Sequence, residues 1–278
     1  MNDGTAPAVA ERTFGSLALR AISALAMAPV AVAAILLGPP YFDLLVALGC
    51  GILAWEWNRL CGGGRAGGPG WALLGVLMAV VGAASLGAFA IAGALALLGA
   101  AAVYGAAAGA GRPTPLWHAG GVLYLALPSL ALLWLQSATG AHAVLWLFLV
   151  VWATDIGAYA AGRLLGGPRL APRLSPNKTW AGVAGGFVAA AVTGSVLGPS
   201  LGVSSRGLVG ALSAFVSLAA QLGDLAESAV KRHFKVKDMS GLIPGHGGLF
   251  DRVDGLLAAA PAVALVALFS GGGVLSWR

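Results

Sequence analysis

Apolar residues run through this chain in long blocks, without the short alternating patterns of a soluble protein. A helix needs about 20 consecutive, mostly apolar residues to cross a bilayer. Nine stretches approach or reach that length, near residues 21–38, 41–58, 70–87, 89–110, 117–136, 141–161, 180–198, 206–226 and 254–271. The third and fourth form one uncharged block from Trp71 to Ala110, long enough for two passes, so a turn is expected at Gly82 to Gly87. The pattern predicts an all-α, polytopic membrane protein.

The composition agrees with this prediction, because 59% of the residues are hydrophobic and only 9% are charged, which lies outside the range of soluble globular proteins. No soluble domain, linker or repeat interrupts the blocks. We therefore expect a single membrane domain over residues 1–278, of which residues 1–20 form a polar N-terminal tail. Cys50 and Cys61 lie in or beside apolar blocks, which excludes a disulfide framework or a zinc site.

The basic residues predict the orientation. With a cytoplasmic N-terminus, nine passes place the C-terminus outside, and all basic residues except Arg206 and Arg278 then lie on the cytoplasmic side. Lysine and arginine concentrate on that side of membrane proteins. The formal net charge of +6 follows from this bias and from attraction to anionic headgroups. Because no soluble module carries the basic residues, a nucleic-acid partner is not expected.

The polar residues that suggest chemistry gather in the segment 150–255, on the predicted cytoplasmic side. Within it, the stretch 228–254 combines dense charge of both signs with glycine-rich turns, a costly arrangement beside a bilayer. Cations suit phosphate oxygens and carboxylates suit a divalent metal. The stretch contains the candidates Lys231, Arg232, Lys237, Asp238, His246, Asp251, Arg252 and Asp254.

Two shorter elements precede it. Asp155 lies about two turns before Arg163 near the end of the sixth predicted span, where the carboxylate either pairs with that arginine or supports a phosphate or metal site. Ser175-Pro176 predicts a helix start, with Ser175 as N-cap and Pro176 at the first helical position. The free N–H groups of such a start attract anions, and Lys178 adds a positive charge nearby.

Asp224, Glu227, Ser228 and Lys231 share one stripe of a predicted helix, because residues three, four and seven apart align. We interpret Glu227 and Lys231 as a surface salt bridge and favour Asp224 as a metal ligand. Asp251 and Asp254 fit either a metal or phosphate site or the N-terminal cap of the last helix. His246 fits a phosphate donor, a proton-handling group or a structural role.

The stretch from Ser228 to Asp254, with Lys237-Asp238 and Asp251-Arg252 in register, resembles the signature of the phosphatidate cytidylyltransferases. Ser175-Pro-Asn-Lys-Thr-Trp180 and the segment from Asp155 to Arg163 are similar to that family too, although Ala181 stands where many members have Glu or Gln. The resemblance implies conversion of CTP and phosphatidic acid to CDP-diacylglycerol and pyrophosphate. It also implies magnesium, with Asp224 and Asp251 as ligands, and leaves room for a second, monovalent cation.

Roles for the remaining candidates follow from this resemblance. The expected catalytic residues are Asp224, Asp251, Lys237, Arg252 and His246. The expected substrate-binding residues are Asp155, Ser175, Asn177, Lys178, Thr179, Lys231, Arg232, Asp238 and Asp254. We expect a multi-pass protein of the bacterial cytoplasmic (inner) membrane, with its active site facing the cytoplasm, and a homodimer.

Two alternatives stay open at this point. Another CTP-dependent lipid enzyme, such as a polyprenol-type kinase or a CDP-archaeol synthase, would use similar groups. A secondary transporter would also contain charged residues within the membrane, but transporters often show internal repeats and broken helices near the midplane. Here the charges gather at one interface, which favours the enzyme.

Overall fold

The computed structural model describes residues 27–62, 67–198, 205–242 and 247–270. Eight helices in these residues are long and apolar enough to cross a membrane. They are α2 (Tyr41–Cys61), α3 (Gly68–Ser85), α4 (Phe89–Gly109), α5 (Pro115–Thr139), α6 (Ala141–Leu164), α7 (Trp180–Leu197), α8 (Arg206–His233) and α9 (Phe250–Phe269). A shorter apolar helix, Met27–Leu37, precedes them. The prediction of a polytopic helical membrane protein is confirmed.

The predicted spans coincide with these helices in order. The block from Trp71 to Ala110 divides where expected, because α3 ends at Ser85 and α4 begins at Phe89. Gly87 lies between them with φ +79°, a left-handed conformation that glycine adopts without a steric penalty. The first predicted span, 21–38, is described only from Met27 onward, and its first residues lie outside the described part of the chain.

The charged stretch 228–254 is more helical than the sequence indicated. Helix α8 continues to His233 and α9 begins at Phe250, so the described non-helical residues of this stretch are 234–242 and 247–249. Strong helix formers continue through Lys231 and Arg232, and basic residues in the last turn interact favourably with the helix dipole. As a result, several candidate side chains stand on rigid helices.

The expectation that Ser175 caps a helix is wrong. Residues Ser175–Thr179 form strand β2, which pairs antiparallel with β1 (Arg169–Ala171) in a hairpin. Pro176 lacks an N–H group and is tolerated at the edge of a sheet. Helix α7 instead begins after Thr179, whose Oγ1 accepts a hydrogen bond from Gly182 N (3.1 Å). Strand pairing therefore prevailed over the local Ser-Pro signal.

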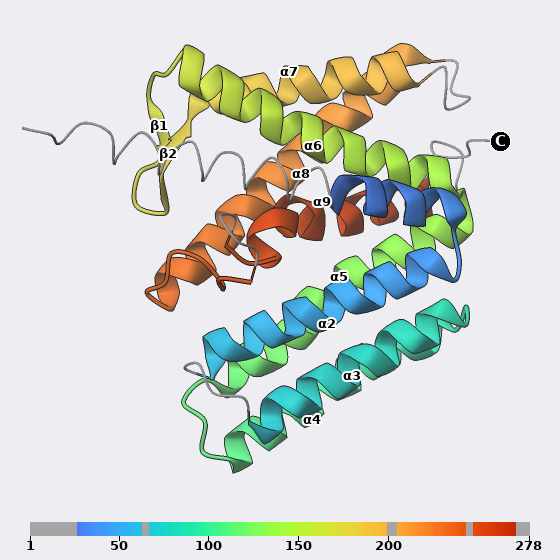
Figure 1. Cartoon of the computed structure of the whole chain (residues 1–278), viewed down its shortest axis with the longest axis vertical. Helices are drawn as coiled ribbons and strands as arrows, with labels where there is room; N and C mark the ends of the chain where they lie inside the picture. Colours follow the sequence, from blue (N-terminus) through green and yellow to red (C-terminus); the bar gives the residue numbers. More distant parts are fainter. Residues whose placement is uncertain (1–26, 63–66, 199–204, 243–246, 271–278) are drawn as a thin grey trace, which may run out of the picture.

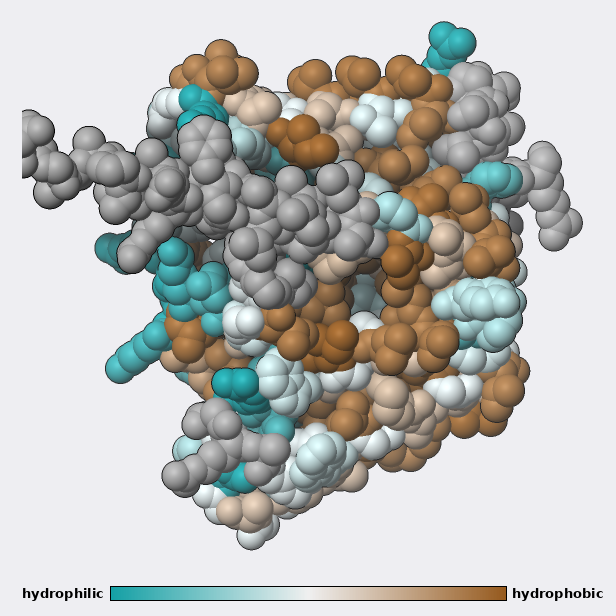
Figure 2. Space-filling view, in the orientation of Figure 1, coloured by the Kyte–Doolittle hydropathy of each residue, from teal (hydrophilic) through white to brown (hydrophobic). Residues whose placement is uncertain are grey.

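The helices form two groups that α9 joins (Figure 1). Helices α2 to α5 pack into one bundle, while α6, α7 and α8 form the other with the hairpin. Helix α9 packs against α8 and α5 and so contacts both groups. Apolar residues cover much of the face in Figure 2, and hydrophilic residues gather toward the end that carries the hairpin. Apolar flanks with a polar end suit a membrane-spanning bundle.

Close packing between α6 and α7 brings the hairpin next to the end of α6. A Cβ atom on Gly157 would lie 2.7 Å from the carbonyl oxygen of Gly185, and a Cβ atom on Gly185 would lie 2.7 Å from that of Gly157. Small residues allow helix backbones to approach in this way within a membrane. The contact places Asp155 on α6 and Thr179 before α7 on the same side of the molecule.

Candidate functional site

A cavity of about 600 Å³ lies between the hairpin and the helices α6, α7, α8 and α9. Many of the predicted site residues line it: Asp155, Asn177, Lys178, Thr179, Asp224, Asp251, Arg252 and Asp254. The wall also includes Tyr159, Arg163 and Gln221, which were not among the predicted site residues. The fold therefore brings carboxylates and cations from distant parts of the sequence to one cavity.

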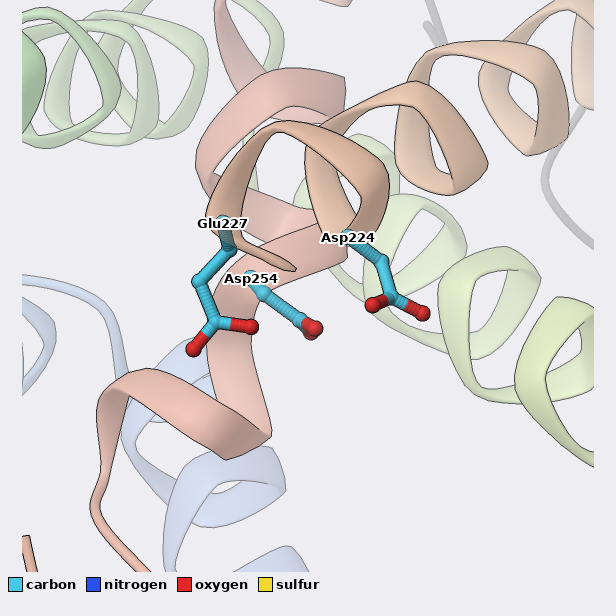
Figure 3. A group of neighbouring side chains, drawn as sticks. All are labelled: Asp224, Glu227 and Asp254. Atoms are coloured by element: carbon cyan, nitrogen blue, oxygen red, sulfur yellow. The ribbon is translucent and has the colours of Figure 1, made fainter. Parts of the chain in front are cut away.

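Three carboxylates lie close together (Figure 3), and two of them, Asp224 and Asp254, line the cavity. Helix α8 supplies Asp224 and Glu227, and α9 supplies Asp254; one oxygen from each lies within 4.8 Å of the others. Glu227 is only 1% exposed, so the interpretation of Glu227 and Lys231 as a surface salt bridge is wrong. The Oε1 atom of Glu227 is buried and has no hydrogen-bond partner among the described residues. A cluster of carboxylate oxygens with an unsatisfied atom fits a hard divalent cation such as magnesium.

Lys231 connects α8 with the start of α9. Its Nζ lies 2.9 Å from Oε2 of Glu227 and 2.7 Å from Oδ1 of Asp251. The other oxygen of Asp251 accepts hydrogen bonds from the backbone N–H groups of Met239 (3.1 Å) and Gly248 (2.8 Å). Asp251 thus lines the same cavity as Asp224 and at the same time fixes the loop before α9. Its role as a metal ligand stays a prediction.

Lys178 forms an ion pair with Asp224 and so connects β2 with α8. Both residues line the cavity, and the Nζ atom of Lys178 is itself buried. The cation stands next to the carboxylate cluster, at a position from which it can contact a phosphate group. Its role in substrate binding stays a prediction.

Arg163 and Asp155 lie on the same wall. The guanidinium of Arg163 donates a hydrogen bond to the hydroxyl of Tyr159 (2.8 Å), and Asp155 lines the cavity. The cavity wall therefore includes Arg163, which is held by an aromatic neighbour on the same helix, in addition to Lys178 and Arg252.

Other predicted residues lie outside the cavity wall. Arg232 is exposed and donates from Nε to the carbonyl oxygen of Leu174 (3.1 Å), which connects the hairpin with the end of α8. Ser175 is half-buried in β2, whereas Lys237 and Asp238 are exposed in the loop after α8. His246 lies outside the described residues.

Sequence reasoning assigned no role to Glu56, a completely buried residue of α2, although Glu56-Trp57 loosely continues the family resemblance. Its Oε1 accepts hydrogen bonds from Ser240 Oγ (2.5 Å) and Leu249 N (3.0 Å), and its Oε2 accepts one from Phe250 N (2.8 Å). The only signal in the sequence was a carboxylate followed by Trp57 inside an apolar block. The partners lie 184 to 194 residues away, beyond the reach of local patterns.

Comparison with known proteins gives consistent matches. The model of the cytidylyltransferase family matches residues 18–270. A phosphatidate cytidylyltransferase of Brucella melitensis is 53% identical over 156 residues, which cover 55% of this chain and 56% of that protein. The enzymes of the same name from Haemophilus influenzae and Bacillus subtilis are 45% and 46% identical over 130 and 125 residues, or 44% and 46% of their lengths. The alignments thus span about half the length of these curated relatives.

Proposed function

The chain belongs to the cytidylyltransferase family, and from this premise we propose that it transfers the cytidylyl group of CTP to phosphatidic acid. The products are CDP-diacylglycerol, which stays in the membrane, and pyrophosphate. The observation that carries the proposal is the cavity at one end of the membrane helices, which is lined by the carboxylates Asp224 and Asp254 and by the cations Lys178 and Arg252. Glu227 completes the acidic cluster beside it. Both kinds of charge are needed to bring two anionic phosphate compounds together.

In the proposed reaction, a phosphate oxygen of phosphatidic acid attacks the α-phosphorus of CTP. A new P–O bond forms there, while the bond from the α-phosphorus to the oxygen that bridges to the β-phosphorus breaks. Pyrophosphate leaves with that bridging oxygen. Because the attacking phosphate is already an anion, no residue has to remove a proton. The work of the chain is to position the reactants and to offset their mutual repulsion.

Cations in the cavity wall are suited to that work. Lys178, Arg163 and Arg252 line the cavity from three different elements, so together they can contact phosphate oxygens from several directions. Arginine binds such oxygens through two parallel N–H groups, and lysine acts as a point charge. When a phosphate arrives, Lys178 can exchange its ion pair with Asp224 for a contact with the substrate.

The acidic cluster fits magnesium, because it offers only oxygen ligands and includes a buried carboxylate oxygen without a partner. Asp224, Glu227 and Asp254 would hold the ion, with Asp251 as the further ligand that the family resemblance implies. Bound magnesium would neutralise charge on the phosphate oxygens of the nucleotide. The chain supplies the ligands from α8 and α9, so the spacing of these two helices sets the geometry of the site.

We infer that the cavity faces the cytoplasm of a bacterial cell across its inner membrane. Support comes from the basic residues, since Arg163, Lys178, Lys231 and Arg252 lie at the cavity end of their elements while Arg206 begins α8 at the other end. Cytoplasmic ends attract such residues, and CTP is present in that compartment. We expect a homodimer as well, which cross-linking in native membranes would detect.

One assay tests the proposed reaction. Purified protein in detergent is incubated with magnesium, phosphatidic acid and CTP labelled in its cytosine ring, and the lipids are identified by mass. We expect a labelled liponucleotide and an equal amount of pyrophosphate. A lipid kinase would instead release labelled CDP and leave the lipid unlabelled, and a transporter would yield neither product. Either of these results would contradict the proposal.

A further inference from the structure

The start of α9 is held by a residue from the other helical group. Its N-cap residue, Leu249, makes no side-chain capping hydrogen bond, although the first N–H groups of a helix have no partner within the helix. Glu56 on α2 accepts the N–H groups of Leu249 (3.0 Å) and Phe250 (2.8 Å). A buried carboxylate in place of a local cap fixes this helix end against α2.

The residue after Glu56 strengthens the same contact. Trp57 stacks on the ring of Phe250 with centroids 5.8 Å apart, and Phe250 stacks on Tyr124 at 5.7 Å. Trp57 is itself held through a hydrogen bond from Nε1 to the carbonyl oxygen of Trp117 (2.8 Å). Neighbouring residues of α2 therefore fix both the backbone and the ring of the first residue of α9.

The loop before α9 approaches Glu56 closely. A Cβ atom on Gly248 would lie 2.3 Å from Oε1 of Glu56, so only glycine fits there without a shift. Ser240 Oγ donates to the same oxygen (2.5 Å). The carboxylate thereby connects the loop after α8, the start of α9 and α2 at one point.

We propose that Glu56 is a positioning residue for the site at which the reaction described above takes place. The inference rests on the proposed function. Glu56 does not line the cavity; it fixes Phe250, and Asp251 follows directly while Asp254 follows one turn later. The carboxylate of Asp254 lies within 4.8 Å of those of Asp224 and Glu227 on α8. Any shift in the start of α9 therefore changes the geometry of the acidic cluster.

Glu56→Ala removes the shared acceptor. We expect hydrogen exchange of peptides from the first turns of α9 to become about tenfold to a hundredfold faster, since a hydrogen bond to a charged group is lost at each of two amides. Bound magnesium should raise the melting temperature of the protein. The magnesium concentration at which half of this rise is reached should be several-fold higher in Glu56→Ala than in the wild type. Glu56→Gln retains one acceptor oxygen and should return both measurements part of the way toward wild type, because its NH2 group replaces the other oxygen and cannot accept the remaining backbone N–H group.

Gln136→Ala is the matched control. Gln136 is 7% exposed, and its side chain donates to the carbonyl oxygen of Ile35 (3.0 Å), so it too makes a buried hydrogen bond between helices. It lies at the opposite end of the membrane helices from the cavity. This variant should lower the melting temperature without changing either the exchange of α9 or the magnesium midpoint.

Exchange and thermal stabilisation need no substrate, so they test the positioning role even if the assay yields no liponucleotide and the proposed function fails. The inference is overturned if Glu56→Ala leaves the exchange of α9 unchanged. It is equally overturned if the magnesium midpoint stays at the wild-type value or changes as much in Gln136→Ala. Should Glu56→Ala fail to fold, Glu56→Asp replaces it in both measurements. It withdraws the carboxylate by one methylene, so the changes in the exchange of α9 and in the magnesium midpoint should have the same direction and a smaller size.

Discussion

Lys231 offers the sharpest test of the electrostatics of the site. Its side chain is 13% exposed and lies between two buried carboxylates, those of Glu227 and Asp251, whose side chains are 1% and 6% exposed. Replacement by methionine in Lys231→Met keeps most of the apolar stem and removes the charge. Two carboxylates then remain buried without the cation that compensates them.

The magnitude follows from the two contacts. At separations of 2.9 and 2.7 Å and an effective dielectric constant of about 20, each contributes roughly 6 kcal/mol of Coulomb attraction. Most of this attraction offsets the hydration that the charged groups lose on burial. Removal of one partner of a buried ion pair costs about 3–5 kcal/mol, which corresponds to a decrease in melting temperature on the order of 10 °C.

Thermal unfolding in one detergent, followed by intrinsic tryptophan fluorescence, measures this loss. Lys235→Met is the control, because Lys235 is exposed in the loop just after α8. The double variant Lys231→Met, Glu227→Gln should recover a large part of the loss, since it also removes one of the uncompensated charges. If Lys231→Met unfolds within about 2 °C of Lys235→Met, a shift typical of exposed charges, the ion pairs do not stabilise the fold and the reasoning is refuted.

Four further variants follow from the same structure. Asp224→Asn should lower magnesium-dependent turnover at least ~100-fold with little loss of stability; near-normal turnover would remove Asp224 from the metal site. Asp251→Asn should also abolish turnover in a folded, membrane-inserted protein, and its metal-ligand role is refuted if activity persists. Lys178→Ala should raise the KM for CTP about tenfold in steady-state kinetics; an unchanged KM would remove Lys178 from the site. Gly185→Ala, whose Cβ would lie 2.2 Å from Ala161 Cβ, should lower the melting temperature, whereas Gly93→Ala, with open space around it, should not.

The helices could be predicted because the cost of exposing apolar residues to water acts over whole blocks of sequence. A block as long as that from Trp71 to Ala110 requires two passes, and the glycines from Gly82 to Gly87 indicated where the turn between them lies. Ser175-Pro176 could not be interpreted in this way. Whether such a dipeptide starts a helix or enters a strand depends on pairing with Arg169–Ala171, which is a contact in space.

The site could be predicted to the extent that its chemistry depends on charged residues, which are rare in this apolar chain. Asp224 and Asp251 lie on different helices and line one cavity, as their charge within an apolar chain suggested. Glu227 was misinterpreted because an i,i+4 pair looks the same on a buried face as on an exposed one. Glu56 was missed for a related reason, since its importance lies in amides almost 200 residues away.

The position of α9 has a consequence for biosynthesis. This helix carries Asp251, Arg252 and Asp254 and follows every other described helix in the sequence, yet it packs against both groups of helices that precede it. Until α9 is synthesised, the acidic cluster consists only of Asp224 and Glu227 on α8 and lacks Asp254. The proposed activity therefore depends on the last described helix, because Glu56 can meet the amides of Leu249 and Phe250 only after α9 has been inserted.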